Sequence, residues 1–349
     1  MDTYELLADL PVTIDSLTLS QQSLDTSSGF TRMTTVVSLE GDGEIGRGED
    51  VTYDSDHHEA LNGANPFDIT GSYTIDSFSD YVGEIELFPD GEPGQSIFHQ
   101  YRQWGFESAA LDLALKQADT SLGEQLDRQY QPVNFIVSTR LGDPPTADRL
   151  HKLRAIHSNL EFKLDPTSDW TTELIHELTE IGGIRVLDLK GLYSGTEVDQ
   201  GADPVLYEQI LEAFPDSLVE DPAIDDATRP LLEQHADRVT WDYPITGIPS
   251  IRDLPWEPEW LNIKPSRFGS ICSLCDTLDY CRAHEIELFG GGQFELSIGR
   301  HHLHTIASLF YPDSPNDVAP RSYHSLEVAR DAPSPPLQQP TDPTGLEWS

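Results

Sequence analysis

The sequence has little positive charge and very little lysine. Against 61 Asp and Glu residues it has 21 Lys and Arg residues, of which only five are lysines, and its formal net charge at pH 7 is −40. The acids are spread along the chain, as in GEDVTYDSDHHE and EDPAIDD. So acidic a surface repels phosphates, which argues against nucleic-acid and anionic-membrane partners. Because dense Asp and Glu with scarce Lys suits high salt, we predict a halophilic protein.

Long apolar runs are also missing. No segment approaches the roughly 18 consecutive apolar residues that a membrane-spanning helix needs. The first residues, MDTYELLADLPV, lack the basic region with which a secretory signal peptide begins. We therefore expect a cytoplasmic protein without a membrane partner.

Cysteine is rare, and its three copies lie in one segment, SICSLCDTLDYCRAH, as Cys272, Cys275 and Cys281. So few cysteines argue against a disulfide framework. The Cys-x-x-Cys spacing is also found in zinc sites, but a single pair is a weak signal. Because the segment has the apolar pattern of a helix, buried structural thiols are the favoured interpretation.

What the chain does contain is two different secondary-structure patterns. Alternating β-branched residues in VTIDSLTLS, MTTVVSLE and EIGRGEDVTY predict strands, and FHQYRQWGFESAALDLALKQAD predicts a helix. From residue 132 onward, seven short apolar runs alternate with helical segments, which indicates parallel strands joined by crossover helices. Without a dinucleotide-binding glycine pattern, seven such units favour a closed barrel over an open sheet.

These patterns predict an α/β protein with three regions. An N-terminal α+β region covers residues 1–128, a β/α barrel covers residues 129–325, and a Pro-rich, irregular tail covers residues 326–349. The predicted barrel strands are 133–138, 159–164, 183–189, 217–221, 238–243, 261–265 and 285–292.

Three consecutive predicted strands end in acids, Asp188, Glu220 and Asp242. In a barrel of this kind the chemistry gathers at the C-terminal ends of the strands, and neighbouring strands are close enough for three inward carboxylates to converge. Such a cluster repels itself unless a cation fills it, and an all-oxygen set suits Mg²⁺ or Mn²⁺. The alternative is that these acids cap the following helices or face solvent.

Two of the five lysines, Lys163 and Lys264, lie on the strands that flank the three acids. In a barrel those two positions face each other across the pocket. A divalent cation nearby would lower the pKa of a lysine, so that its amine could act as a base near neutral pH. We predict that Lys163 and Lys264 are the catalytic acid/base residues.

At these residues the chain resembles the enolase superfamily and, within it, the muconate-lactonizing-enzyme subgroup. The metal ligands of that family align with Asp188 in VLDLKG, Glu220 in VEDP and Asp242 in TWDYP. Its lysines align with Lys163 in EFK and Lys264 in NIKPSRFGS. The strand-seven acid region of the family resembles GGGQFELSIGR, with Glu295.

The resemblance implies a modified (β/α)7β TIM-type barrel with an N-terminal α+β capping domain. It also implies a Mg²⁺ ion that binds the carboxylate of a small substrate, a lysine that removes the α-proton, and a metal-stabilised enediolate. The subgroup includes cycloisomerases, o-succinylbenzoate synthases and epimerases. Homo-oligomers are typical of the superfamily.

The chain departs from the family pattern at three places. The first lysine of the Lys-x-Lys motif is replaced by Glu161, and the asparagine of Asp-x-Asn is replaced by Lys190. Lys190 either brings a third amine to the metal site or points outward, and we favour the outward orientation. The Asp-x-Asp motif of dipeptide epimerases is not evident, because Asp313 and Asp317 are spaced differently. No dipeptide substrate is therefore predicted.

Four further residues are predicted to bind substrate: Ser138, Arg267, Gln293 and Glu295. Arg267 either binds a substrate carboxylate or pairs with an acid of the pocket. The GGG segment before Gln293 has too little context for a phosphate-binding loop, so a close backbone approach at a strand exit is the favoured interpretation.

The histidine clusters are assigned no metal. His301, His302 and His304 start a predicted helix at spacings that do not share one face. His57 and His58 lie among acids in the N-terminal region, where we expect both to face solvent.

Three functions are compatible with these residues. The first is a Mg²⁺-dependent lyase or isomerase that abstracts an α-proton, as a cycloisomerase, a racemase or epimerase, or a dehydratase. The second is an o-succinylbenzoate synthase. The third is a barrel that binds a metal or ligand without turnover, which Glu161 and Lys190 motivate.

Overall fold

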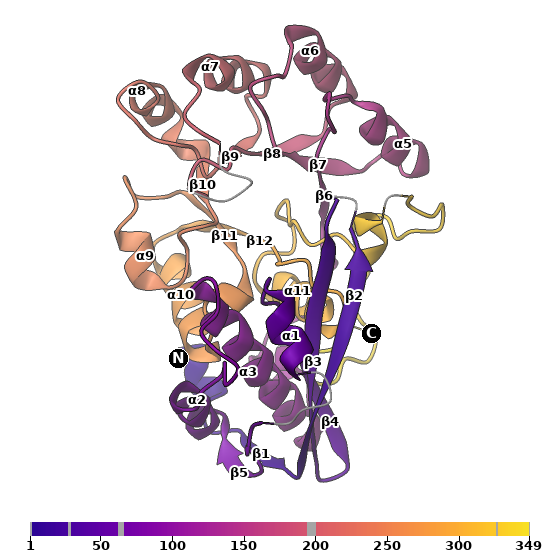
Figure 1. Ribbon diagram of the computed structural model, residues 1–349, viewed down its shortest axis with the longest axis vertical. Helices are drawn as coiled ribbons and strands as arrows, with labels where there is room; N and C mark the ends of the chain where they lie inside the picture. Colours follow the sequence, from indigo (N-terminus) through magenta and orange to yellow (C-terminus); the bar gives the residue numbers. More distant parts are fainter. Residues whose placement is uncertain (1, 27–28, 62–65, 194–199, 326, 349) are drawn as a thin grey trace.

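The computed structural model describes residues 2–26, 29–61, 66–193, 200–325 and 327–348. The N-terminal part contains an antiparallel sheet in the order β2–β3–β4 and a small sheet of β1 and β5, and the following part contains a seven-stranded parallel sheet (Figure 1). None of the described helices is long and apolar enough to span a membrane.

The N-terminal part combines strands, helices and one 3₁₀ helix. Its elements are η1 (Tyr4–Leu6), β1 (Pro11–Ile14), β2 (Ser16–Asp25), β3 (Thr31–Gly41), β4 (Glu44–Asp50), α1 (Ser55–Leu61), β5 (Gly71–Thr74), α2 (Ile75–Glu84), α3 (Ile97–Gln117) and α4 (Leu122–Gln125).

Helix α3 lies directly on β4 because two glycines of that strand leave room for it. A Cβ atom at Gly46 would lie 2.3 Å from the Ala109 carbonyl oxygen, and one at Gly48 would lie 2.0 Å from that of Gly105. Another side of α3 contacts η3 (Pro265–Arg267) in the barrel part. Buried on several sides, α3 connects the N-terminal sheet to the end of the barrel that holds the candidate site.

The parallel sheet follows the order β12–β11–β10–β9–β8–β7–β6, so each strand pairs with its neighbours in sequence. Its strands are β6 (Ile136–Thr139), β7 (Glu161–Leu164), β8 (Ile184–Asp188), β9 (Leu218–Glu220), β10 (Val239–Trp241), β11 (Trp260–Ile263) and β12 (Glu287–Gly290). The helical segments among and after them are α5 (Asp148–Ile156), α6 (Thr172–Ile181), α7 (Pro204–Ala213), α8 (Arg229–Leu232), η2 (Glu233–Arg238), α9 (Ile248–Arg252), η3, α10 (Ile271–Ala283), α11 (Ile298–Phe310) and η4 (Arg321–His324).

A short segment, Asn316–Asp317, connects the two edge strands of this sheet. The Asn316 side chain accepts a hydrogen bond from the Gly290 amide of β12 (2.7 Å), and the Asp317 amide donates to the Gly290 carbonyl (2.7 Å). On the other side, the Ile136 amide of β6 donates to the Asn316 carbonyl (2.8 Å). The segment takes the place of an eighth strand, so the predicted (β/α)7β barrel with an N-terminal α+β domain is confirmed.

The barrel interior has an apolar layer on one side of the candidate site. Ile136, Val186, Leu218 and Phe289 form a separate buried cluster, against which Trp260 packs. Val186 and Leu218 each lie two residues before a strand-end acid, and side chains two residues apart on a strand share a face. The charged side chains of the next layer therefore point into the same interior.

The C-terminal tail is irregular, as predicted, but it packs against both parts of the chain. Leu337 forms an antiparallel bridge with Val133, and Gly345 forms a parallel bridge with Ser121. Leu346 is buried, with 1% of its surface exposed. The tail therefore adds to the core, which its proline content did not indicate.

The cysteine prediction is confirmed, and one histidine prediction is wrong. Cys275 and Cys281 are buried free thiols, and Cys272 is partly buried. His58 is fully buried instead of facing solvent, because its two ring nitrogens bond to the Thr35 hydroxyl and the Thr52 carbonyl, both at 2.8 Å.

Candidate active site

The strand register brings the predicted site residues to one end of the barrel. Asp188 of β8 is paired in register with Glu220 of β9, and Glu220 is paired with Thr240, two residues before Asp242. Lys163 of β7 is paired with Ser138 of β6 and with Val186 of β8, two residues before Asp188. The three acids have no exposed surface, so their charges are kept out of bulk water.

Lys163 lies in the middle of the acids. Its ammonium group contacts Glu220 Oε1 and lies 3.1 Å from Asp188 Oδ2 and 3.5 Å from Asp317 Oδ2. Burial would lower the pKa of Lys163, but Asp188 and Glu220 raise it well above its ordinary value. This shift is opposite in direction to the lowering of the pKa that was predicted for a lysine beside a divalent cation.

Lys264 follows β11 and contacts the third acid. Its ammonium lies 2.7 Å from Asp242 Oδ2, which also accepts a hydrogen bond from the Tyr193 hydroxyl (3.1 Å). Arg267 Nε lies 3.3 Å from Asp242 Oδ1, and another nitrogen of Arg267 donates to the Tyr243 carbonyl (2.9 Å). Of the two roles considered for Arg267, pairing with a pocket acid is the one seen in the structure. The residue also lines the cavity.

Lys190 points into the site, so the expected outward orientation is wrong. Its backbone has a positive φ of 52°, and the side chain turns back so that the ammonium contacts Asp188 Oδ2. Burial would raise the pKa of Asp188, but the ammonium groups of Lys163 and Lys190 hold it well below its usual range. The other departure from the family pattern, Glu161, instead pairs with Arg185 of β8 (3.1 Å), and both side chains are partly exposed.

A fourth acid, Asp221, was not predicted. Its carboxylate accepts hydrogen bonds from the amides of Asp242 (2.9 Å) and Tyr243 (2.8 Å), and so it positions the end of β10. Burial, Asp242 and Asp188 raise the pKa of Asp221 to about 7. The sequence carried a signal for it, because it directly follows Glu220 in VEDP.

The donor set fits a hard divalent cation. Within the described residues, one oxygen each of Asp188, Glu220 and Asp221 lies within 4.8 Å of the others. Asp242 lies outside that group, with its oxygens directed at Lys264, Tyr193 and Arg267. Several buried carboxylates at adjoining strand ends are the ligand type that Mg²⁺ or Mn²⁺ prefers. Burial and the neighbouring acids raise the pKa of Glu220 in spite of Lys163, as expected for acids crowded together.

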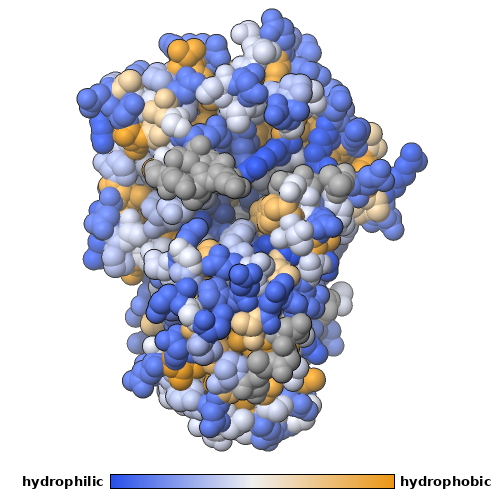
Figure 2. Space-filling model, in the orientation of Figure 1, coloured by the Kyte–Doolittle hydropathy of each residue, from blue (hydrophilic) through white to orange (hydrophobic). Residues whose placement is uncertain are grey.

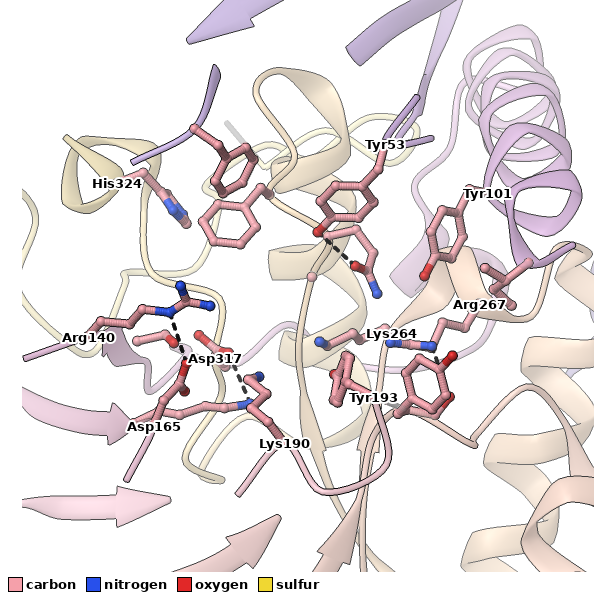
Figure 3. Close-up of a pocket in the computed structure, with 18 of the residues that line it drawn as sticks. Tyr53, Tyr101, Arg140, Asp165, Lys190, Tyr193, Lys264, Arg267, Asp317 and His324 are labelled. Atoms are coloured by element: carbon pink, nitrogen blue, oxygen red, sulfur yellow. Dashed lines mark hydrogen bonds and ion pairs between the residues drawn. The ribbon is translucent and has the colours of Figure 1, made fainter. Parts of the chain in front are cut away.

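The site opens into a cavity of about 310 Å³. Six cationic side chains line it: Arg140, Lys163, Lys190, Lys264, Arg267 and Arg300. Figure 3 shows Lys190 and Lys264 reaching into it from different elements, with Asp165 and Asp317 beside Lys190. The outer face in Figure 2 is mostly hydrophilic, in a chain with 61 acids and 21 bases. A cavity rich in cations in so acidic a chain favours an anionic ligand.

The N-terminal part covers this cavity. Phe30 packs edge-to-face against Phe294 with ring centroids 5.5 Å apart, and the Tyr53 hydroxyl donates to Gln293 Oε1 (3.1 Å). The buried Arg32 donates to the backbone carbonyls of Gln293 (3.1 Å) and Thr52 (2.6 Å). No pattern in the sequence indicated Phe30 and Tyr53 as lining residues, because both come from loops of the N-terminal part.

The structure separates the predicted substrate-binding residues into two groups. Ser138, Arg267 and Gln293 line the cavity. Glu295 is buried and is not among the residues that line the cavity, and its role in substrate binding stays a prediction. Its Oε1 accepts the Gln293 amide (2.8 Å), and its Oε2 lies 3.5 Å from Arg300. Glu295 therefore stabilises the loop after β12 through the Gln293 amide and Arg300.

Family models match both parts of the chain. The domain of unknown function (DUF8230) N-terminal domain matches residues 5–125, and the DUF8230 C-terminal domain matches residues 129–325. The chain belongs to the DUF8230 family. We propose that the two matches correspond to a capping domain over residues 1–128 and a barrel over residues 129–325.

This DUF8230 protein is also similar to characterised proteins. It is 24% identical to o-succinylbenzoate synthase of Bacillus subtilis (strain 168) over 246 residues, which is 62% of this chain and 59% of that protein. Its fold is similar to a dipeptide epimerase from Methylococcus capsulatus complexed with Mg, with a TM-score of 0.66, 17% identity and coverage of 87% and 89% of the two chains. A muconate cycloisomerase from Pseudomonas fluorescens gives a TM-score of 0.65, 16% identity and coverage of 88% and 87%. The predicted resemblance to the enolase superfamily is thus confirmed for the fold.

Proposed function

We propose that this protein is an enzyme, a Mg²⁺-dependent lyase or isomerase that removes the α-proton of a small carboxylate. The observation that carries the proposal is the pair of buried lysines, Lys163 of β7 and Lys264 after β11, on either side of the strand-end acids. Each ammonium contacts one or more of those acids, and both lysines line the cavity. Dipeptide epimerase, muconate cycloisomerase and o-succinylbenzoate synthase, which resemble this chain, support the same class of reaction.

Asp188, Glu220 and Asp242 would hold the cation, and Asp221 would position the Asp242 backbone just after β10. When bound, Mg²⁺ (or Mn²⁺) would supply positive charge that stabilises the negative charge developing on the substrate carboxylate. The support for this ligand set is the burial of all three acids and their position at the ends of β8, β9 and β10.

The side chains of the chain itself would move the proton. One lysine, whose pKa the bound cation would lower, would accept the α-proton at a neutral Nζ, and the other ammonium would either return a proton from the opposite side or stabilise the product electrostatically. Return of a proton from the opposite side gives racemisation or epimerisation. Electrostatic stabilisation by the second lysine gives elimination or cycloisomerisation. Phe30 and Tyr53 would keep water from the reacting atoms by covering the cavity.

The test is hydrogen exchange at the α-carbon. The protein is incubated in D₂O with Mg²⁺ and molar KCl against pooled small carboxylates, and α-deuterium is read by mass spectrometry. Lys163→Ala and Lys264→Ala should each lower the exchange rate by about 10²–10⁴-fold, which is the usual contribution of a general acid or base. Lys152→Ala, at an exposed lysine of α5, is the matched control and should change nothing.

Three outcomes separate the alternatives. Metal-dependent exchange that either lysine variant abolishes supports the proposal, and deuterium in recovered substrate as well as product supports two-base chemistry. Exchange that survives both lysine changes contradicts it. Binding of Mg²⁺ and of carboxylates without exchange across the panel favours a barrel without turnover.

A second candidate, an o-succinylbenzoate synthase, is favoured by the 24% identity with the Bacillus subtilis enzyme. Its test is dehydration of the precursor that yields o-succinylbenzoate, assayed in molar KCl with Mg²⁺. Failure to form that product, with exchange on other carboxylates intact, removes this candidate and leaves the broader proposal.

A homo-oligomer is also proposed, and light scattering in molar KCl would measure the assembly.

A further inference from the structure

Lys190 contacts both carboxylate oxygens of Asp188, one with its backbone amide and the other with its ammonium group. The Lys190 amide donates to Asp188 Oδ1 (3.2 Å), and its ammonium contacts Asp188 Oδ2. The positive φ of 52° at Lys190 makes this turn possible, although residues other than glycine and asparagine rarely adopt a positive φ. One residue therefore engages both oxygens of an acid proposed to hold a cation.

A second ammonium shares the same oxygen. Lys163 Nζ lies 3.1 Å from Asp188 Oδ2, the atom that Lys190 contacts. The side chain of Asp188 is fully buried, so water reaches neither contact readily. A divalent cation that bound this oxygen would meet two positive charges at close range, and like charges in a buried site repel strongly.

Of these two ammonium groups, that of Lys190 has the better alternative position. Lys163 also contacts Glu220 and lies deep in the barrel, with 2% of its side chain exposed. The side chain of Lys190 is 15% exposed and lines the cavity. Its ammonium lies 5.1 Å from the centre of the Tyr193 ring, which can accept a cation on its face. Lys190 can therefore leave Asp188 without leaving the cavity.

We propose that Lys190 is an internal competitor for the divalent cation at Asp188. Its ammonium occupies the cation's position on Asp188 Oδ2, lowers the affinity of the site, and moves into the cavity when the metal binds. This inference rests on the proposed function, since it concerns the same metal site. It makes Lys190 a positioning residue that acts on the cation through Asp188, rather than a catalytic residue.

The experiment measures Mn²⁺ affinity from the electron paramagnetic resonance signal of the free ion, in molar KCl and without substrate. Lys190→Asn should bind Mn²⁺ about tenfold or more tightly than the unchanged protein, because one competing charge is removed. Asparagine tolerates a positive φ, so the variant keeps the backbone turn. Lys190→Arg keeps the charge and should stay within about threefold of the unchanged protein, and so should the surface control Lys152→Asn.

A second measurement follows Lys190 itself. Acetylation of the lysines by acetic anhydride, mapped by mass spectrometry, should increase at Lys190 when Mn²⁺ is present, with the exposed Lys152 as internal reference. A purely structural role for Lys190 would raise neither the Mn²⁺ affinity of Lys190→Asn nor the acetylation of Lys190.

Asp188→Asn separates the possible failures. Equal Mn²⁺ affinity in the unchanged protein and in Lys190→Asn, lost in Asp188→Asn, overturns the role of Lys190 and leaves the metal site standing. Unchanged acetylation of Lys190 on Mn²⁺ binding overturns the proposed movement. Absence of Mn²⁺ binding in every variant overturns the proposed metal site, and the competition with it.

Discussion

Among the described residues, two of the clusters of buried charge differ in how their charges are paired. The cap cluster, in the N-terminal part, consists of Asp50, His58 and Arg102. Arg102 Nε lies 2.8 Å from Asp50 Oδ2, and its other nitrogens donate to the carbonyls of Leu87 (2.8 Å) and His57 (3.3 Å). Burial would raise the pKa of Asp50, but Arg102 and its other partners lower it to about 2.

The barrel cluster consists of Lys163, Asp188, Lys190, Glu220, Asp221, Asp242, Lys264 and Arg267. Here carboxylates crowd together, two ammonium groups share one oxygen of Asp188, and the lysines and Arg267 line a cavity. Burial raises the pKa of Glu220 in this cluster, whereas Asp50 of the cap cluster is held ionised. Buried charge alone therefore does not mark a functional site. Crowded carboxylates, some with pKa values raised by burial and by one another, next to a cavity are the better indication.

The largest expected effect is on stability at the cap cluster. Arg102→Met leaves Asp50 buried without its cation, which should lower the free energy of unfolding by about 3–5 kcal/mol. Chemical denaturation in molar KCl measures it, with Arg330→Met at an exposed arginine as control. The double variant Asp50→Asn/Arg102→Met should recover part of the loss. A loss below about 1 kcal/mol for Arg102→Met would contradict the difference between the clusters, because Asp50 would then not depend on its paired cation.

Glu107 sharpens the comparison, because this buried acid on α3 has no cation among its hydrogen-bond partners in the described part of the chain. It accepts from the Ile271 amide (2.8 Å) and the side chains of Gln103 (2.7 Å) and Ser79 (2.8 Å), and burial raises its pKa from 4.5 to about 7. The folded state thus keeps a proton that the unfolded state loses between pH 4.5 and about 7, so stability falls as the pH rises through that range.

Glu107→Gln should remove this pH-dependent loss of stability, which amounts to about 3 kcal/mol. Denaturation of both proteins from acid to mildly alkaline pH tests it, and the difference between them isolates Glu107 because all other groups are common. Parallel pH profiles would contradict the expected proton uptake.

A smaller effect of opposite sign is expected in the barrel cluster. Glu220→Gln removes one of the crowded negative charges while keeping an acceptor for Asn262 (3.2 Å). In EDTA at neutral pH this variant should be more stable than the unchanged protein by about 1–2 kcal/mol, although it should bind Mn²⁺ more weakly. The exposed Glu208→Gln is the control. Destabilisation of Glu220→Gln would show that its pairing with Lys163 outweighs the repulsion.

The smallest expected effect concerns salt. The stability of the unchanged protein should rise from dilute buffer to molar KCl, because salt screens repulsion among the surface acids. The Arg102→Met penalty should change by less than about 0.5 kcal/mol over the same range, since buried pairs are screened little. Equal stability in both buffers would remove the prediction of a halophilic protein. A penalty that depends on salt would mean that Asp50 and Arg102 are reached by solvent.

The sequence by itself determined the barrel and the strand ends at which the candidate site residues lie. Apolar runs spaced 20 to 30 residues apart gave strands of the right type and order, because burial on both faces of a parallel sheet requires them. The acids at Asp188, Glu220 and Asp242 follow those runs directly, so their place at one end of the barrel followed from the strand direction.

Only the tertiary structure decided which side chains enter the site. Lys190 turns inward because its own backbone takes a positive φ, and Glu295 turns away because the Gln293 amide holds it. Phe30 and Tyr53 reach the cavity from a different part of the chain. The period of a strand specifies a face for each residue, but loop conformation and contacts between distant segments depend on packing that no local pattern encodes.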